Sequence, residues 1–147
     1  MLLSRTSVNL SELVFEITES AAMSNIEMTQ ILIRQLRELG CSCALDNFGV
    51  GFSSFYYLKR FDVDYLKIDG SFVSELATDE ASRLFVRSLC DVAKGLNKHV
   101  IAERVETSEV LALLKPLGVD FAQGHHIAHP KPFIVPHEIG LQAAQSA

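Results

Sequence analysis

Short apolar runs alternate along this chain with longer amphipathic segments. The run LVFEI at residues 13–17 is followed by residues 24–39, where apolar side chains recur at helical spacing until Gly40 ends the pattern. The same order then repeats, so further strands are expected at CSCAL, DYLKIDG, HVIAERV and VDFAQG, and further helices at about 54–60, 78–95 and 108–115. Nearly continuous apolar strands alternating with helices are typical of a parallel sheet covered by helices. The pattern predicts an α/β fold with about five parallel strands.

One polar side chain falls at or near the carboxyl end of each expected strand. These residues are Glu16, Asp46, Lys67, Glu103 and Gln123. In a closed β/α barrel the carboxyl ends of the strands form one face on which residues from several strands converge, whereas an open sheet would spread them along a line. Their placement favours a TIM-type barrel over an open doubly wound sheet.

Asn47, Asp69 and Glu106 add further oxygen donors at this face. So many carboxylates in one place repel each other unless a cation neutralises them. Oxygen ligands favour Mg²⁺ or Mn²⁺, sometimes Ca²⁺, and two such ions can activate water and clamp the phosphate of a phosphodiester. Each residue alone has a structural alternative, because strand-end acids often cap helices and Lys67 with Asp69 could form a surface pair. The joint pattern is what indicates a site.

Composition narrows the possible partners. The formal net charge is −5, with 13 basic and 18 acidic residues, which lacks the basic surface typical of proteins that bind nucleic-acid polymers. The sequence contains no apolar run long enough to span a membrane and no signal-peptide pattern at MLLSRTSVNLSEL, so a cytoplasmic location is predicted. The 147 residues suffice for one domain or part of one. Cys41, Cys43 and Cys90 are expected to be buried free thiols, with a metal or redox pair as the alternative.

Five segments, in this order, resemble the motifs of the bacterial EAL domain, the phosphodiesterase that linearises cyclic di-GMP. They are FEITES, LDNFGVGFSS, LKIDGSFV, IAERVET and AQG. The resemblance covers about residues 8–133, so that residues 1–133 are expected to be the carboxyl-terminal portion of an EAL-type barrel and 134–147 a tail. It implies a modified TIM barrel whose strand ends hold two Mg²⁺ or Mn²⁺ ions over cyclic di-GMP.

The resemblance also implies roles for single residues. The positions that resemble metal ligands are Glu16, Asp46, Asn47 and Glu103. The positions that resemble catalytic or substrate-binding residues are Lys67, which would place the attacking water, Glu103 and Gln123. The positions that resemble supporting residues are Glu19, which would anchor the glycine-rich loop, Glu106 behind Glu103, and the loop residues Gly49, Gly51 and Ser53. In the family this loop couples metal binding to dimerisation.

Three departures from the family pattern lower the expected activity. The Glu-Ala-Leu segment and an asparagine ligand, expected ahead of FEITE, are missing from this sequence. Asn47 stands where a second aspartate is usual and is a neutral, weaker ligand, while Arg104 replaces a glycine and could take over a metal's electrostatic role beside Glu103. The chain is therefore expected to be an inactive or impaired phosphodiesterase. The alternative is a non-catalytic cyclic di-GMP receptor or protein-interaction module.

Two further expectations concern assembly and the histidines. Five strands cannot close an eight-stranded barrel and would leave two apolar edges, so self-association or an upstream domain half is expected to cover them. The stretch HHIAHP places His125, His126 and His129 close together, which allows a metal site but favours solvated loop histidines, and His137 reads as a tail residue.

Overall fold

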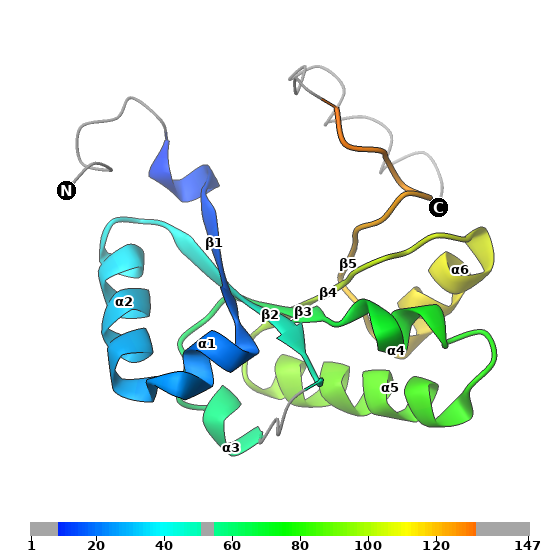
Figure 1. The fold of residues 1–147 in the computed structure, drawn as a ribbon, viewed down its shortest axis with the longest axis horizontal. Helices are drawn as coiled ribbons and strands as arrows, with labels where there is room; N and C mark the ends of the chain where they lie inside the picture. Colours follow the sequence, from blue (N-terminus) through cyan, green and yellow to red (C-terminus); the bar gives the residue numbers. More distant parts are fainter. Residues whose placement is uncertain (1–8, 51–54, 132–147) are drawn as a thin grey trace.

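The computed structural model describes residues 9–50 and 55–131 of the chain (Figure 1). Within these ranges five strands form one parallel sheet in the order β1-β2-β3-β4-β5. Their bounds are β1 Val14–Thr18, β2 Ser42–Phe48, β3 Tyr65–Ile68, β4 His99–Ala102 and β5 Phe121–Ala122. Each strand pairs with its neighbour in sequence, as expected for consecutive units of a β/α barrel. The predicted fold, five parallel strands of an incomplete TIM-type barrel, is confirmed.

Figure 1 shows most of the helices gathered along one side of the curved sheet. The described helices are α1 Glu19–Ser24, α2 Ile26–Glu38, α3 Phe55–Leu58, α4 Gly70–Ser74, α5 Glu80–Gly95 and α6 Ser108–Leu117, with a 3₁₀ turn, η2, at Leu10–Glu12. None of them is long and apolar enough to cross a membrane. The single helix expected over residues 24–39 begins at Ile26, because the Asn25 side chain caps it by accepting from the N–H of Met28.

The hydrophobic core lies between the sheet and these helices. Alternate residues of each strand point to this side, and Leu45, Leu66, Ile68 and Val100 are at most 2% exposed. Packing at this interface is the main stabilising contribution, since burying one such side chain is favourable by about 1.5–3 kcal/mol.

All three cysteines are free and buried. Burial raises the pKa of Cys43 to about 11 and that of Cys90 to about 12, because a thiolate is poorly solvated among apolar side chains. The prediction of buried free thiols is confirmed.

The other side of the sheet carries an apolar surface that the described residues leave exposed. Val14, Tyr65, His99 and Phe121 lie there, since parallel strand partners such as Tyr65 and His99 share a face. The rings of Tyr65, His99 and Phe121 lie 5.8–6.1 Å apart by their centroids. Val14 and Phe121 are 47% and 50% exposed. We call these four residues the open face.

Candidate functional site

Charged side chains from four neighbouring strands meet at the carboxyl end of the sheet, on the same side as the open face. Lys67, in the central strand β3, is 3% exposed. Its Nζ atom lies 2.8 Å from Glu16 Oε2 of β1, 3.4 Å from Asp46 Oδ1 of β2 and 2.7 Å from Glu103 Oε1, directly after β4. The alternation of side chains along strands brings this set together, because Glu16 lies two residues beyond Val14, and Lys67 two beyond Tyr65. We call these residues the Lys67 cluster.

Lys67 is a permanent cation in this setting. Burial opposes its charge, but the hydrogen bonds to Glu103 and Glu16 and the nearby charge of Asp46 outweigh burial and raise the Lys67 pKa above its ordinary value. A lysine held in this way keeps its proton at neutral pH. It can donate hydrogen bonds to water or to phosphate oxygens, and it cannot act as a general base.

Asp46 carries a feature that fits a cation ligand. Its Oδ1 atom is buried and makes no hydrogen bond in the described part of the chain, although it lies within ion-pair distance of Lys67. Its Oδ2 atom accepts from Asn47 Nδ2 at 3.1 Å. A buried carboxylate oxygen without a hydrogen bond is uncommon and is usually completed by an ion or water. The oxygen chemistry of Asp46 and its neighbours suits Mg²⁺ or Mn²⁺.

The arrangement of these acids nevertheless differs from the one expected from sequence. In the described ranges, no three side chains of histidine, cysteine, aspartate or glutamate are grouped so that they could hold a metal ion. Glu16, Asp46 and Glu103 all turn to the Lys67 ammonium, which supplies part of the positive charge expected from a divalent metal.

Glu19 ties the segment after β2 to the rest of the fold. This side chain is 6% exposed, and its Oε2 atom accepts the N–H of Gly49 at 3.1 Å. Gly49 has a φ of 109°, and a Cβ there would lie 2.8 Å from Phe85 Cζ and 2.9 Å from Phe72 Cε2, whose rings are stacked. Glycine is therefore required at this position. The remaining predicted loop residues, Gly51 and Ser53, lie outside the described residues.

Three other predicted site residues form no ion pair with the Lys67 cluster in the described part of the chain. Glu106 and Gln123 have exposed side chains, and Gln123 is placed by its backbone, which donates to Ala102 O and accepts from Val105 N. Asp69 caps helix α4, with Oδ1 accepting from the N–H of Ser71 at 2.8 Å. Asp69 thus matches the capping alternative considered for strand-end acids.

Arg104 points elsewhere than expected. Its side chain crosses Gly70, where an added Cβ would overlap the Cβ, Cγ and Cδ atoms of Arg104. The described part of the chain shows no ion pair between Arg104 and Glu103, whose carboxylate binds Lys67 instead. The expected substitute for a metal beside Glu103 is therefore Lys67 and not Arg104.

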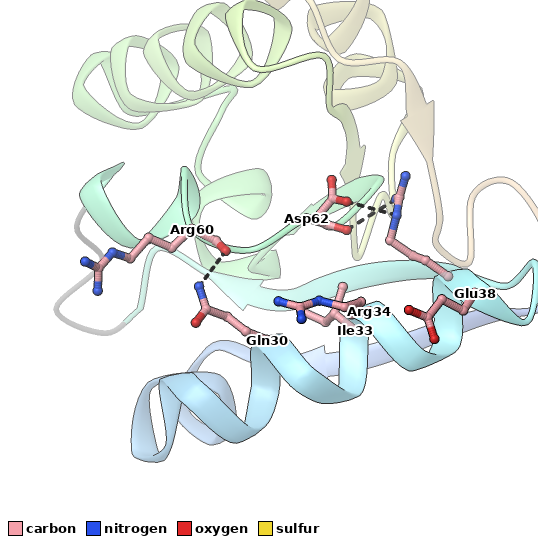
Figure 2. Close-up of a pocket in the computed structure, with 7 residues that line it drawn as sticks. Gln30, Ile33, Arg34, Glu38, Arg60 and Asp62 are labelled. Atoms are coloured by element: carbon pink, nitrogen blue, oxygen red, sulfur yellow. Dashed lines mark hydrogen bonds and ion pairs between the residues drawn. The ribbon is translucent and has the colours of Figure 1, made fainter.

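A separate cavity of about 460 Å³ opens between α2 and the segment that leads into β3 (Figure 2). The Arg37 guanidinium binds Asp62 at 3.0 Å and Asp64 there, and Gln30 Nε2 donates to Arg60 O at 3.0 Å. These contacts join α2 to the amino end of β3, away from the Lys67 cluster at the carboxyl end. Because Asp62 and Glu38 in the lining, together with Asp64 bound to Arg37, offset the arginines, the cavity has no strong preference for anions.

The histidines after β5 do not form the alternative metal site in the described structure. The rings of His125 and His129 are stacked with centroids 4.8 Å apart, and both residues are exposed. No third ligand joins them within the described residues.

Comparison with known proteins places this arrangement in a family. The EAL domain matches residues 1–130. The chain belongs to the EAL domain family. The EAL chain is 39% identical over 133 residues to the cyclic di-GMP phosphodiesterase PdeF of Escherichia coli and 44% identical over 118 residues to the cyclic di-GMP phosphodiesterase PdeB of Shewanella oneidensis. These matches cover 90% and 80% of this chain, which spans 18% and 14% of the two relatives.

Solved EAL structures share the fold. The PaMucR phosphodiesterase in complex with cyclic di-GMP matches with a TM-score of 0.82 and 37% identity, covering 88% of this chain and 53% of that one. Klebsiella pneumoniae BlrP1 in a complex with manganese and cyclic di-GMP matches with a TM-score of 0.75 and 28% identity, covering 80% of this chain and 30% of that one. The motif resemblance stated from sequence is confirmed.

Proposed function

We propose that this EAL chain carries the carboxyl-terminal part of a cyclic di-GMP phosphodiesterase site and hydrolyses cyclic di-GMP weakly or not at all by itself. The Lys67 cluster is the observation that supports the proposal, because it joins a buried ammonium to three carboxylates at the carboxyl ends of parallel strands. That end of a β/α barrel is where active sites are built. The names of the relatives indicate the substrate class.

The residues of the cluster have distinct roles in this proposal. Lys67 donates hydrogen bonds to the attacking water or to a phosphate oxygen, since its proton is retained. Glu16, Glu103 and Asp46, with its unsatisfied oxygen, would become ligands of Mg²⁺ or Mn²⁺ only when Lys67 moves away from them, and Asn47 would be a weaker ligand. A bound divalent ion would lower the pKa of a water molecule and neutralise charge on the phosphate.

Weak turnover is expected because the Lys67 cluster has few negative charges left to bind a divalent ion. Asn47 contributes no charge, and the three carboxylates are already engaged by Lys67. Incubation with cyclic di-GMP and Mn²⁺, followed by chromatography for the linear dinucleotide, tests this. Little or no product is expected from the chain as given, more from Asn47→Asp, and none from Lys67→Met. Robust turnover by the unmodified chain would contradict the proposed impairment.

A second candidate function is a receptor that binds cyclic di-GMP without hydrolysing it. It is favoured by the ion pairs of Lys67 with Glu16 and Glu103, because an ammonium of the chain itself already engages two of the carboxylates. Calorimetry with cyclic di-GMP in the presence of EDTA separates the two functions. Binding that survives EDTA supports a receptor, whereas binding that requires Mn²⁺ supports a metal-dependent enzyme site.

We also propose that a second copy of the chain covers the open face. Val14 and Phe121 expose large apolar surfaces there, and β1 and β5 have one unpaired edge each in the described structure. A second copy presents the same surface and the same edges, so one association buries both. An upstream half of the domain is the competing occupant.

Light scattering after size-exclusion chromatography tests this association. A dimer is expected for the wild type, and Phe121→Ser should shift it towards monomer. Leu84→Ser is the matched control, because Leu84 is 65% exposed on helix α5, on the helical side of the sheet. A monomeric wild type, or equal effects of both substitutions, would rule out a second copy on the open face.

A further inference from the structure

Arg104 is an exposed cation beside the Lys67 cluster, held in a backbone conformation that is uncommon for its residue type. It follows Glu103 directly and has a φ of 54°. Residues with a Cβ seldom adopt this left-handed region, and such conformations concentrate at binding and catalytic sites. The conformation directs the side chain from the end of β4 towards the neighbouring unit of the fold.

The aliphatic part of Arg104 is fixed by close packing. It crosses Gly70, the first residue of α4, so tightly that no other residue could replace this glycine without a shift. The adjacent carboxylate is Asp69, whose pKa is held below its usual range by hydrogen bonds from Ser71 and further by the charge of Arg104. Burial of Asp69 acts in the opposite direction.

The guanidinium of Arg104 makes no direct contact with an acceptor in the described structure, although its charge acts on Asp69. Within residues 9–50 and 55–131, no hydrogen bond or ion pair engages it, and Asp69 is committed to Ser71. Its five donors are therefore available to a ligand, although its stem is held in place. A pre-positioned arginine loses less conformational entropy on binding than a freely moving one.

The Lys67 cluster is negatively charged overall, so the positive charge of Arg104 would help an anionic ligand to bind beside it. Glu16, Asp46 and Glu103 outnumber the single ammonium of Lys67, so the face repels an anion. A ligand with phosphate groups therefore needs further positive charge beside the Lys67 cluster. Arginine can supply it, because its guanidinium binds two phosphate oxygens at once. Building on the function proposed above, we propose that Arg104 is a specificity-determining residue that binds a phosphate of the cyclic dinucleotide.

Calorimetric titration with cyclic di-GMP, in buffer with Mn²⁺ and with EDTA, tests this role. Arg104→Gln is expected to raise Kd about tenfold or more, and Arg104→Lys by less, because lysine keeps the charge but loses the bidentate geometry. Arg34→Gln is the matched control. Arg34 is exposed on α2, lines the cavity of Figure 2 and should leave Kd unchanged.

A parallel titration with guanosine, which lacks phosphate, separates a phosphate contact from a general disturbance of the site. Arg104→Gln should leave the weak affinity for guanosine unchanged. Equal losses for both ligands, or a cyclic di-GMP Kd within twofold of the wild type, would overturn the role of Arg104 alone. Absence of wild-type binding under both buffers would instead overturn the proposed function together with it.

Discussion

Lys67 is the cation that compensates the three carboxylates of the candidate site. Removing one partner of a buried ion pair leaves the other without compensation and costs about 3–5 kcal/mol. Because the Glu16 side chain is 49% exposed and can turn to water, we expect Lys67→Met to lower the free energy of unfolding by about 3 kcal/mol, at the low end of that range. Urea denaturation measures the change. Lys94→Met, at an exposed position of α5, should change stability little.

The pH dependence of this contribution has a definite sign. The Lys67 pKa is raised in the folded state, so its stabilisation is complete below the ordinary lysine value of about 10.4 and declines only as pH rises through the raised value. The difference in stability between wild type and Lys67→Met should therefore be the same at about pH 6 and about pH 9. A difference that shrinks across this window would show that Lys67 loses its proton there.

The buried thiols are expected to be unreactive in the folded chain. Raised pKa values, about 11 for Cys43 and about 12 for Cys90, leave almost no thiolate at about pH 8. Native protein should react negligibly with a thiol reagent at that pH, and all three cysteines should react after unfolding in urea. Rapid labelling of the native chain would show that the core around them opens.

Sequence patterns identified the Lys67 cluster but not the environment of Asp69 and Arg104. Glu16, Asp46, Lys67 and Glu103 could be predicted together because strand alternation and the common edge of parallel strands fix their positions. The direction of the Arg104 side chain depends on a positive φ and on close approach to Gly70, which no local pattern specifies. The arginine in place of the family's glycine marked residue 104 as unusual. It did not indicate in which direction the Arg104 side chain points.

Among the elements, the turn from β2 into the glycine-rich loop is the most sharply constrained. Gly49→Ala would place a methyl group against the Phe72 and Phe85 rings at a φ of 109°. Such overpacking costs about 1–3 kcal/mol, and the backbone strain adds to it. Thermal or urea unfolding should show this loss, together with weaker packing of the two rings in near-ultraviolet circular dichroism.

Gly95 provides the matched control for this substitution. It ends α5, and a Cβ there would meet nothing within 4 Å. Gly95→Ala should stabilise the chain by up to about 1 kcal/mol, because alanine loses less backbone entropy in a helix. Destabilisation by both alanines would indicate a general effect of glycine replacement and not the Phe72–Phe85 contact.

The start of helix α6 was predictable, whereas the short helices were not. Helix α6 begins at Ser108, as expected from the sequence, directly after Thr107, whose side chain accepts from the N–H of Val110. Helices α1 and α4 were missed, because six and five residues carry too little periodicity to detect. Both depend on their caps, Thr18 and Asp69, and on packing, of α1 against β1 and β2 and of α4 against α5.

The order and direction of the strands followed from the sequence, because consecutive β/α units place neighbouring strands side by side. The sequence predicted that two strand edges would be unpaired, but it did not predict which side chains form the open face. That Tyr65, His99 and Phe121 form a cluster of rings on it depends on the register between β3, β4 and β5. The sequence assignment of residues 134–147 to a tail and the cytoplasmic location both remain predictions.

The open face also predicts how the molecule binds a hydrophobic dye. If a second copy covers it, fluorescence of 8-anilinonaphthalene-1-sulfonate per mole of chain should fall as protein concentration rises, since association removes the apolar surface. Phe121→Ser should remove much of the signal at low concentration. Fluorescence per mole that is independent of concentration would indicate that the face stays uncovered or is covered within one chain.

The Lys67 ammonium has a further consequence for ion binding. The ammonium pairs with the same three carboxylates that a divalent ion would need, so it competes with the ion for them. Because it belongs to the chain, its local concentration is not lowered by dilution. At the proposed metal site, only the fraction of molecules in which Lys67 has moved away from the carboxylates could admit an ion, so the measured affinity would be the intrinsic affinity reduced by that fraction. Under the proposed function, the Lys67 ammonium would therefore occupy the site until the concentration of the divalent ion is high enough to displace it.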